Sequence, residues 1–174
     1  LEKAIAAVVR ESVRCNVSGR TDAGVHAIAQ VVNFYTSNQL PPMQLMRAIN
    51  AHLPTDVVVQ SAEEAPQVFD ANRDARGKWY RYYVHIGPVR PVFLRRYVWH
   101  VPWHLDLEKM QSASQVLLGR HDFRSFETEW PNRMSSVRNI TYLSWRQQGP
   151  LVWLDIAADG SYEIFLGPKR EPGP

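Results

Sequence analysis

Apolar residues recur at helical spacing in three segments of this chain and alternate with polar residues in several others. The helical spacing predicts helices over residues 1–15, 42–53 and 106–119. The alternating and short apolar runs predict strands over residues 28–35, 57–59, 79–86, 137–145 and 151–157. Helices that interleave with hairpin-like strands indicate an α+β fold, with a largely antiparallel mixed sheet and helices on one face.

Basic and aromatic residues are concentrated in one part of the chain. The whole sequence of 174 residues has a formal net charge of only +3, but residues 75–105 contain no Asp or Glu. There, arginines and a lysine alternate with tyrosines and tryptophans, which suits the phosphates and bases of a nucleic acid together. The alternative is a pair of strands whose aromatic side chains fill the core and whose cations are merely solvated.

One loop combines glycines, an acid and a fixed cation in ten residues, S-G-R-T-D-A-G-V-H-A at positions 18–27. Gly19 and Gly24 allow positive φ on either side of the acid. Arg20 can form an ion pair with Asp22 and keep it ionised, and an ionised, positioned carboxylate can act as a nucleophile. The alternative is an ordinary turn, with Asp22 bonded to its own backbone and Arg20 as its surface partner.

This loop resembles the G-R-T-D-x-G-V-H-A motif of the tRNA pseudouridine synthase A (TruA) family. Further segments resemble motifs of the same family in the same order, over roughly residues 1–160. They are R-A-I-N-A-H-L-P at 47–54, F-D-A at 69–71 with K-W-Y-R-Y at 78–82, L-G-R-H-D-F-R-S-F at 118–126 and S-V-R-N-I at 136–140.

The resemblance implies a pseudouridine synthase-like fold and the isomerisation of uridine to pseudouridine on the 3′ side of the anticodon stem-loop of tRNA. It makes Asp22 the catalytic carboxylate, oriented by Arg20, and places Tyr80 against the uracil that leaves the stack. Tyr82 lies two positions further on the same face of the strand and is the alternative to Tyr80.

The same resemblance implies a tRNA partner, a homodimer, a cytoplasmic location and no cofactor or metal. The single Cys15 excludes a disulfide within one chain and fits a reducing compartment. No stretch is long and apolar enough for a membrane span. Candidate RNA-binding residues are Arg81, Tyr82, Arg95, Arg96, Arg138 and His26.

The chain departs from the family pattern at both ends, since it starts inside the first helix and its residues 161–168 replace the family's F-L-Y-x-M-V-R. We therefore expect a partial catalytic region over residues 1–160, from which residues 161–174 depart. Within it, residues 1–60 hold the Asp22 loop and residues 61–160 the RNA-binding strands. We expect the chain to be a fragment or a disrupted reading of a longer gene.

Three other functions remain open at this point. A catalytically impaired RNA-binding fragment would keep the basic and aromatic strip and would not need Asp22. A metal-dependent phosphodiesterase would use Asp22 as a ligand, but the loop offers no second acid close by. A plain interaction module would leave the Asp22 loop unexplained.

Overall fold

A computed structural model describes residues 1–126 and 135–159 of the chain. The chain forms two compact units, the first over residues 1–74 and the second beginning at Ala75. The Asp22 loop belongs to the first unit, and the strand with Tyr80 belongs to the second. The division at residue 60, with the Asp22 loop before it and the RNA-binding strands after it, stays a prediction.

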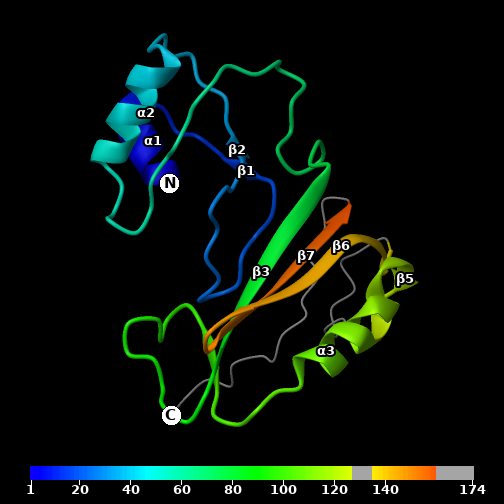
Figure 1. Cartoon of the computed structure of the whole chain (residues 1–174). Helices are drawn as coiled ribbons and strands as arrows, with labels where there is room; N and C mark the ends of the chain where they lie inside the picture. Colours follow the sequence, from blue (N-terminus) through cyan, green and yellow to red (C-terminus); the bar gives the residue numbers. More distant parts are fainter. Residues whose placement is uncertain (127–134, 160–174) are drawn as a thin grey trace. The chain divides into compact units, whose positions relative to one another are not determined.

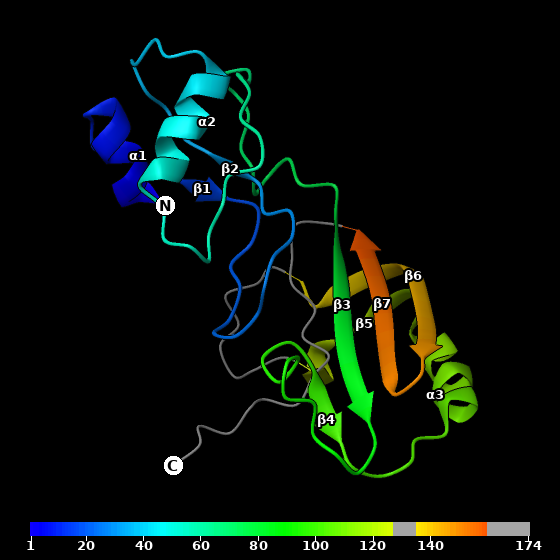
Figure 2. The same ribbon diagram turned by 60° about the vertical axis from the view of Figure 1, so that its left-hand side comes forward.

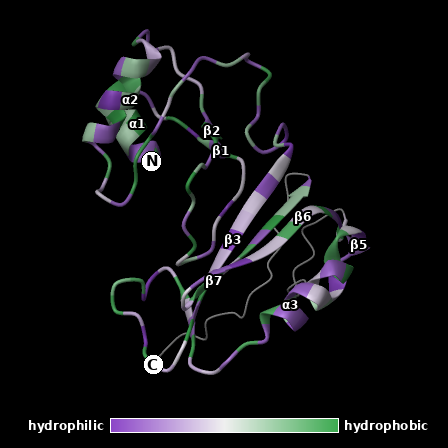
Figure 3. Cartoon of the chain, viewed as in Figure 1, coloured by the Kyte–Doolittle hydropathy of each residue, from purple (hydrophilic) through white to green (hydrophobic). Residues whose placement is uncertain are grey.

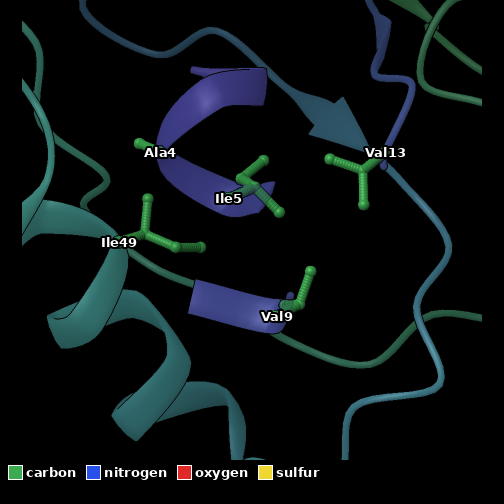
Figure 4. Packing of buried hydrophobic residues seen from close by; sticks show 5 residues of the cluster. All are labelled: Ala4, Ile5, Val9, Val13 and Ile49. Atoms are coloured by element: carbon green, nitrogen blue, oxygen red, sulfur yellow. The ribbon is translucent and has the colours of Figure 1, made fainter. Parts of the chain in front are cut away.

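The first unit packs two helices and a short hairpin around a small apolar core. Its elements are α1 (Glu2–Val9), β1 (Asn16–Val17), β2 (Val32–Asn33) and α2 (Pro42–Ala51). Strands β1 and β2 pair antiparallel. Figure 4 shows the buried cluster, in which Ile5 and Val9 of α1 meet Ile49 of α2. Burying this apolar surface stabilises the unit.

Helix α1 is shorter than its apolar pattern predicts. It ends at Val9, because Arg10 adopts a left-handed conformation with φ of 60° and its N–H donates to the carbonyl oxygen of Ala6 over 2.9 Å. Val13 nevertheless joins the same core from outside the helix. The periodicity therefore identified the buried residues but placed the helix end wrongly.

The strands predicted in the first unit are largely wrong. Of residues 28–35, only Val32–Asn33 form a strand. Residues 57–59 form none, because Val59 is bound to the side chain of Asn50 at both its N–H (2.7 Å) and its carbonyl (2.9 Å). An amide side chain thus takes the place of a neighbouring strand.

The second unit is built on a five-stranded sheet of order β4-β3-β7-β6-β5 (Figures 1 and 2). Its strands are β3 (Gly77–Ile86), β4 (Trp99–Val101), β5 (Gly119–Asp122), β6 (Val137–Gln148) and β7 (Leu151–Asp159). Among these described strands, only the β3–β4 pair is parallel; the other three pairs are antiparallel. The α+β class and the largely antiparallel mixed sheet are confirmed.

One face of this sheet is apolar, and α3 (Leu107–Ser114) and the short 3-10 helix η1 (Gln115–Leu117) pack against part of it. Ile140 and Ile156 are each 1% exposed on it. The indole Nε1 of Trp145 donates to Ser114 Oγ of α3 over 3.1 Å, which fixes the helix on the sheet. Strand β3 is less apolar than the core of this face, because its residues are mostly aromatic or basic, and it has mainly pale to purple shades in Figure 3.

Two strands of the sheet are absent from the sequence-based prediction. Strand β4 has only three residues and pairs parallel to β3 after a connection without a long helix, which is an uncommon arrangement. Strand β5 consists of Gly119, Arg120, His121 and Asp122, a polar sequence that lacks any apolar alternation. The long strands β3, β6 and β7 are confirmed.

We predict that Ile156→Ala lowers the free energy of unfolding of the second unit by about 2–5 kcal/mol, because it opens a cavity in the cluster with Phe123 and Ile140. All six tryptophans lie after residue 74, so tryptophan fluorescence during urea unfolding follows this unit. Val116→Ala is the control, since Val116 is 73% exposed and its truncation is expected to change stability by less than about 0.5 kcal/mol. Equal effects of the two substitutions would contradict the position of the core.

Candidate active site

The Asp22 loop is the connection between β1 and β2, and hydrogen bonds close it at its base. The N–H of Ser18 donates to the carbonyl of Val31 over 2.9 Å, directly beyond the paired strands. Ser18 Oγ donates to Gln30 Oε1 over 2.5 Å, and Gln30 Nε2 donates to the carbonyl of Gly19. One glutamine therefore joins the two ends of the loop.

Asp22 begins a tight turn at the exposed part of this loop. The N–H of Val25 donates to the carbonyl of Asp22 over 3.0 Å, and Gly24 has φ of 85°. A turn with positive φ at its third residue requires glycine there, because a Cβ would be strained in that conformation. Gly24 thus plays its predicted part, whereas Gly19 is not among the glycines with positive φ in the described residues.

The expected ion pair between Arg20 and Asp22 does not form in the part of the chain that the structure describes. Both side chains are exposed, and the backbone of Asp22 is held by its turn hydrogen bond with Val25. An exposed pair gains little from the interaction, because water screens it and two side chains lose freedom. His26 lies in the same exposed loop.

Tyr80 and Tyr82 lie on β3 and share the face of the sheet that is apolar. Across the β3–β7 pair, Tyr80 stands opposite Ile156 and Tyr82 stands opposite Leu154. Both tyrosines are half-buried. The predicted alternation of β3 is therefore correct, and the tyrosines keep part of their surface available.

Arg81 lies on the other face of β3 and is held by a buried carboxylate that the sequence pattern alone did not identify. Asp155 of β7 is 1% exposed. Arg81 donates from Nε to Oδ1 over 2.6 Å and from Nη2 to Oδ2 over 2.9 Å. Trp79 Nε1 adds a third hydrogen bond, to Oδ1 over 3.2 Å. The signal was an acid within the apolar run L-V-W-L-D-I-A-A, because buried carboxylates need partners.

The ion pair shifts the pKa of both its members. Burial raises the pKa of Asp155, but the hydrogen bonds from Arg81 and Trp79 outweigh this, so its pKa lies below the ordinary value of 3.8. The hydrogen bond to Asp155 raises the pKa of Arg81 above its ordinary value. Arg81 keeps 40% of its side chain exposed, and its predicted role in RNA binding has to accommodate this ion pair.

Arg95 and Arg96 lie in the connection between β3 and β4, where both are exposed. A short turn organises this segment, since the carbonyl of Leu94 accepts from the N–H groups of Tyr97 (2.8 Å) and Val98 (3.2 Å). Phe93 beside them is 96% exposed. The basic and aromatic residues of this connection are therefore on the surface, not in the core.

Arg138 differs from these arginines because it is only 6% exposed. Its Nη1 donates to the carbonyl oxygens of Ser135 and Val137, each over 2.7 Å. With Arg120 it also lines an open polar hollow of about 460 Å³. The guanidinium thus organises the chain before β6, and contact with RNA stays a prediction for it.

Among the described residues, no group of three or more His, Cys, Asp and Glu side chains is placed to hold a metal ion. Within those residues, too, none of the helices has the length and apolar character that crossing a bilayer requires.

A family model described as "tRNA pseudouridine synthase" matches residues 1–72 of the chain. This match ends close to the boundary of the first unit, which contains the Asp22 loop. The first unit, with its Asp22 loop, is therefore similar to the class of tRNA pseudouridine synthases.

Curated relatives extend the similarity to both units. The tRNA pseudouridine synthase A of Acetivibrio thermocellus is 38% identical over 99% of this chain and 72% of its own length. That of Pelobacter propionicus is 40% identical over 92% of this chain and 66% of its own length. That of Geobacillus sp. is 47% identical over 75% of this chain and 52% of its own length. The chain thus spans between about half and three quarters of these relatives.

The chain belongs to the tRNA pseudouridine synthase A family, a family of tRNA-modifying isomerases.

We predict that Asp155→Asn flattens the acid dependence of stability. A carboxyl whose pKa is lowered by folding stabilises the fold above the ordinary value of 3.8, and this contribution is lost as the pH falls below it. Urea unfolding from about pH 6 down to about pH 3 should therefore show a steeper loss of stability in the wild type than in the variant. Parallel curves would mean that Asp155 is not held ionised in the folded protein.

Proposed function

We propose that this chain isomerises uridine to pseudouridine in the anticodon stem-loop of tRNA, with Asp22 as the catalytic carboxylate. The observation that carries this is the exposed Asp22 in a loop fixed by Gly24 and Gln30, in a member of a pseudouridine synthase family. The carboxylate has no ion-pair partner among the described residues, so it is available to a substrate.

The reaction breaks the bond between N1 of uracil and C1′ of the ribose, turns the base, and joins C5 to C1′. The hydrogen of C5 is released as a proton, and N1 gains one, so the change is an isomerisation. Asp22 can form a covalent intermediate with the sugar or the pyrimidine, or stabilise the charge that develops on the sugar. Each route needs the base outside its stack.

Tyr80 is proposed to pack on the turned-out uracil, with Tyr82 beside it. Stacking on an aromatic ring replaces part of the stacking energy that the base loses on leaving the RNA helix. The half-buried ring of Tyr80, which stands opposite Ile156 of β7, supports this role, because a partly packed ring loses little freedom on binding. Arg20 is proposed to orient Asp22 once RNA is bound, when the exclusion of water strengthens their attraction.

Binding is proposed to depend on the exposed cations of the second unit together with His26. Arg95 and Arg96, beside the exposed Phe93, best fit contacts with phosphates and a base. Arg81 and Arg138 are weaker candidates, because their guanidinium groups already bind Asp155 and backbone carbonyls. A homodimer, a cytoplasmic location and the absence of a cofactor are proposed on the family resemblance.

We predict that Asp22→Asn lowers the rate of pseudouridine formation by about a thousandfold or more while tRNA still binds, because the substitution keeps the side-chain shape and removes the charge. Release of tritium from tRNA labelled at uridine C5 measures the reaction, and filter binding measures affinity. Asp56→Asn is the matched control, an exposed acid of the same unit that should keep full activity.

The second candidate function is RNA binding without catalysis, favoured by the acid-free stretch from residue 75 to 105. It predicts no product from either protein and equal tRNA affinity for the wild type and Asp22→Asn. Product from the wild type excludes it, and product from both proteins would remove Asp22 from the mechanism.

We also predict that replacing Arg95 and Arg96 together by Ala weakens tRNA binding and makes the dependence of log affinity on log salt shallower. The slope should decrease by about 1 for each phosphate that these side chains neutralise in the wild type. Filter binding over a series of salt concentrations measures the slope. Lys109→Ala is the control, because Lys109 is an exposed cation of the same unit on α3 that should leave the slope unchanged. Equal slopes for all three proteins would show that the two arginines do not bind phosphate.

A further inference from the structure

Asp155 of β7 binds the two residues that stand on either side of Tyr80. Trp79 and Arg81 both direct their donors to this carboxylate, from one face of β3. Side chains alternate along a strand, so Tyr80 projects from the opposite face. One buried group therefore holds the side chains immediately before and after the proposed stacking tyrosine.

This arrangement fixes the register between β3 and β7. Arg81 pairs with Asp155 and Tyr80 with Ile156 across the two strands. A shift by one residue would turn Tyr80 to the other face and leave the carboxylate without its donors. Since an unpaired buried charge is strongly unfavourable, the carboxylate selects this register.

The two donors are themselves held in place by aromatic neighbours on the same face. The ring of Trp79 lies 4.9 Å from the ring of Tyr142 on β6. The guanidinium carbon of Arg81 lies 5.9 Å from the ring centre of Tyr83 and 6.0 Å from that of Trp153. Such contacts with aromatic faces add to the ion pair. The segment from Trp79 to Arg81 consequently has little freedom to move relative to β7.

The proposed role of Tyr80 in packing on the uracil requires that its ring has a defined position. A group that must meet a substrate in one geometry loses about a hundredfold in rate when it is misplaced by about 1 Å. The ring of Tyr80 must lie parallel to a uracil that is being turned, whereas affinity for tRNA depends on many phosphate contacts elsewhere. A small displacement of Tyr80 should therefore affect the chemical step more than binding.

We propose that Asp155 is a positioning residue for Tyr80, which it places by binding Trp79 and Arg81 on either side. The proposal rests on the proposed function, because it takes Tyr80 as the residue that packs on the uracil. Asp155 itself does not touch the substrate. It acts from the opposite face of the sheet, through the backbone of β3.

The test compares steady-state kinetics of the wild type and Asp155→Asn, which keeps the side-chain volume and removes the charge. We expect kcat to fall by about ten- to a hundredfold while KM for tRNA stays within about twofold. Asp106→Asn is the matched control in the same unit, because Asn also caps a helix and α3 should be preserved.

A second control separates positioning from a general loss of stability. Ile140→Val removes one methyl group from the apolar core on β6 and should lower stability without changing kcat at a temperature where it is folded. Trp79→Phe removes one donor to Asp155 and keeps an aromatic ring beside Tyr142. It should lower kcat several-fold, and adding it to Asp155→Asn should cost less than the product of the two separate effects.

The outcomes distinguish the inference from the function beneath it. An active wild type with an equally active Asp155→Asn variant overturns the inference and leaves the proposed function standing. A wild type without product overturns the proposed function. In that case hydrogen exchange still tests whether Asp155 holds β3. The amides of residues 77–83 should exchange faster in folded Asp155→Asn than in the wild type. Unchanged exchange would show that Asp155 does not position this strand.

Discussion

The carboxylate of Asp155 and the donors that reach it from β3 determine how the central strands of the second unit are held. A charge that is 1% exposed is tolerated because Arg81 binds both of its oxygens and Trp79 adds a third hydrogen bond. The pair has a structural consequence beyond satisfying this charge. It excludes other registers of β3 on β7 and so determines which side chains of β3 face the apolar core and which lie on the opposite face with Trp79 and Arg81.

The first unit, in contrast, holds a carboxylate, that of Asp22, in an exposed position. Backbone hydrogen bonds and Gln30 close the Asp22 loop, and Gly24 supplies the left-handed residue that its turn needs. The acid therefore has a defined position while its charge stays available. In this respect Asp22 and Asp155 are opposites, since the first is exposed and the second is buried and bonded to Arg81 and Trp79.

How much of the fold could be predicted depends on whether an element leaves an extended pattern in the sequence. The strands β3, β6 and β7 and the helix α2 were predicted because their patterns extend over many residues. The end of α1 at Arg10 and the tethering of Val59 by Asn50 depend on single conformations and side-chain bonds, which leave no periodic pattern. Strand β4 depends on pairing with a distant partner, so three residues alone do not reveal it.

The candidate site was predictable in part for the same reason. The Asp22 turn is encoded locally by Gly24, and the alternation of β3 correctly separated Tyr80 from Arg81. The partner of Arg81 was not found, because Asp155 lies 74 residues away in the sequence and the adjacent acid-free stretch suggested that the arginine was free for RNA. An acid in the middle of an apolar strand was the signal that pointed to such a partner.

The proposed function requires that the target uridine meets the Asp22 loop. It is tested most directly by placing 4-thiouridine at the target position of the anticodon stem-loop, irradiating the complex with the wild-type chain, and mapping the cross-linked peptides. The proposed function predicts that this nucleotide cross-links to peptides from residues 18–31. Cross-links that leave out these peptides would contradict it.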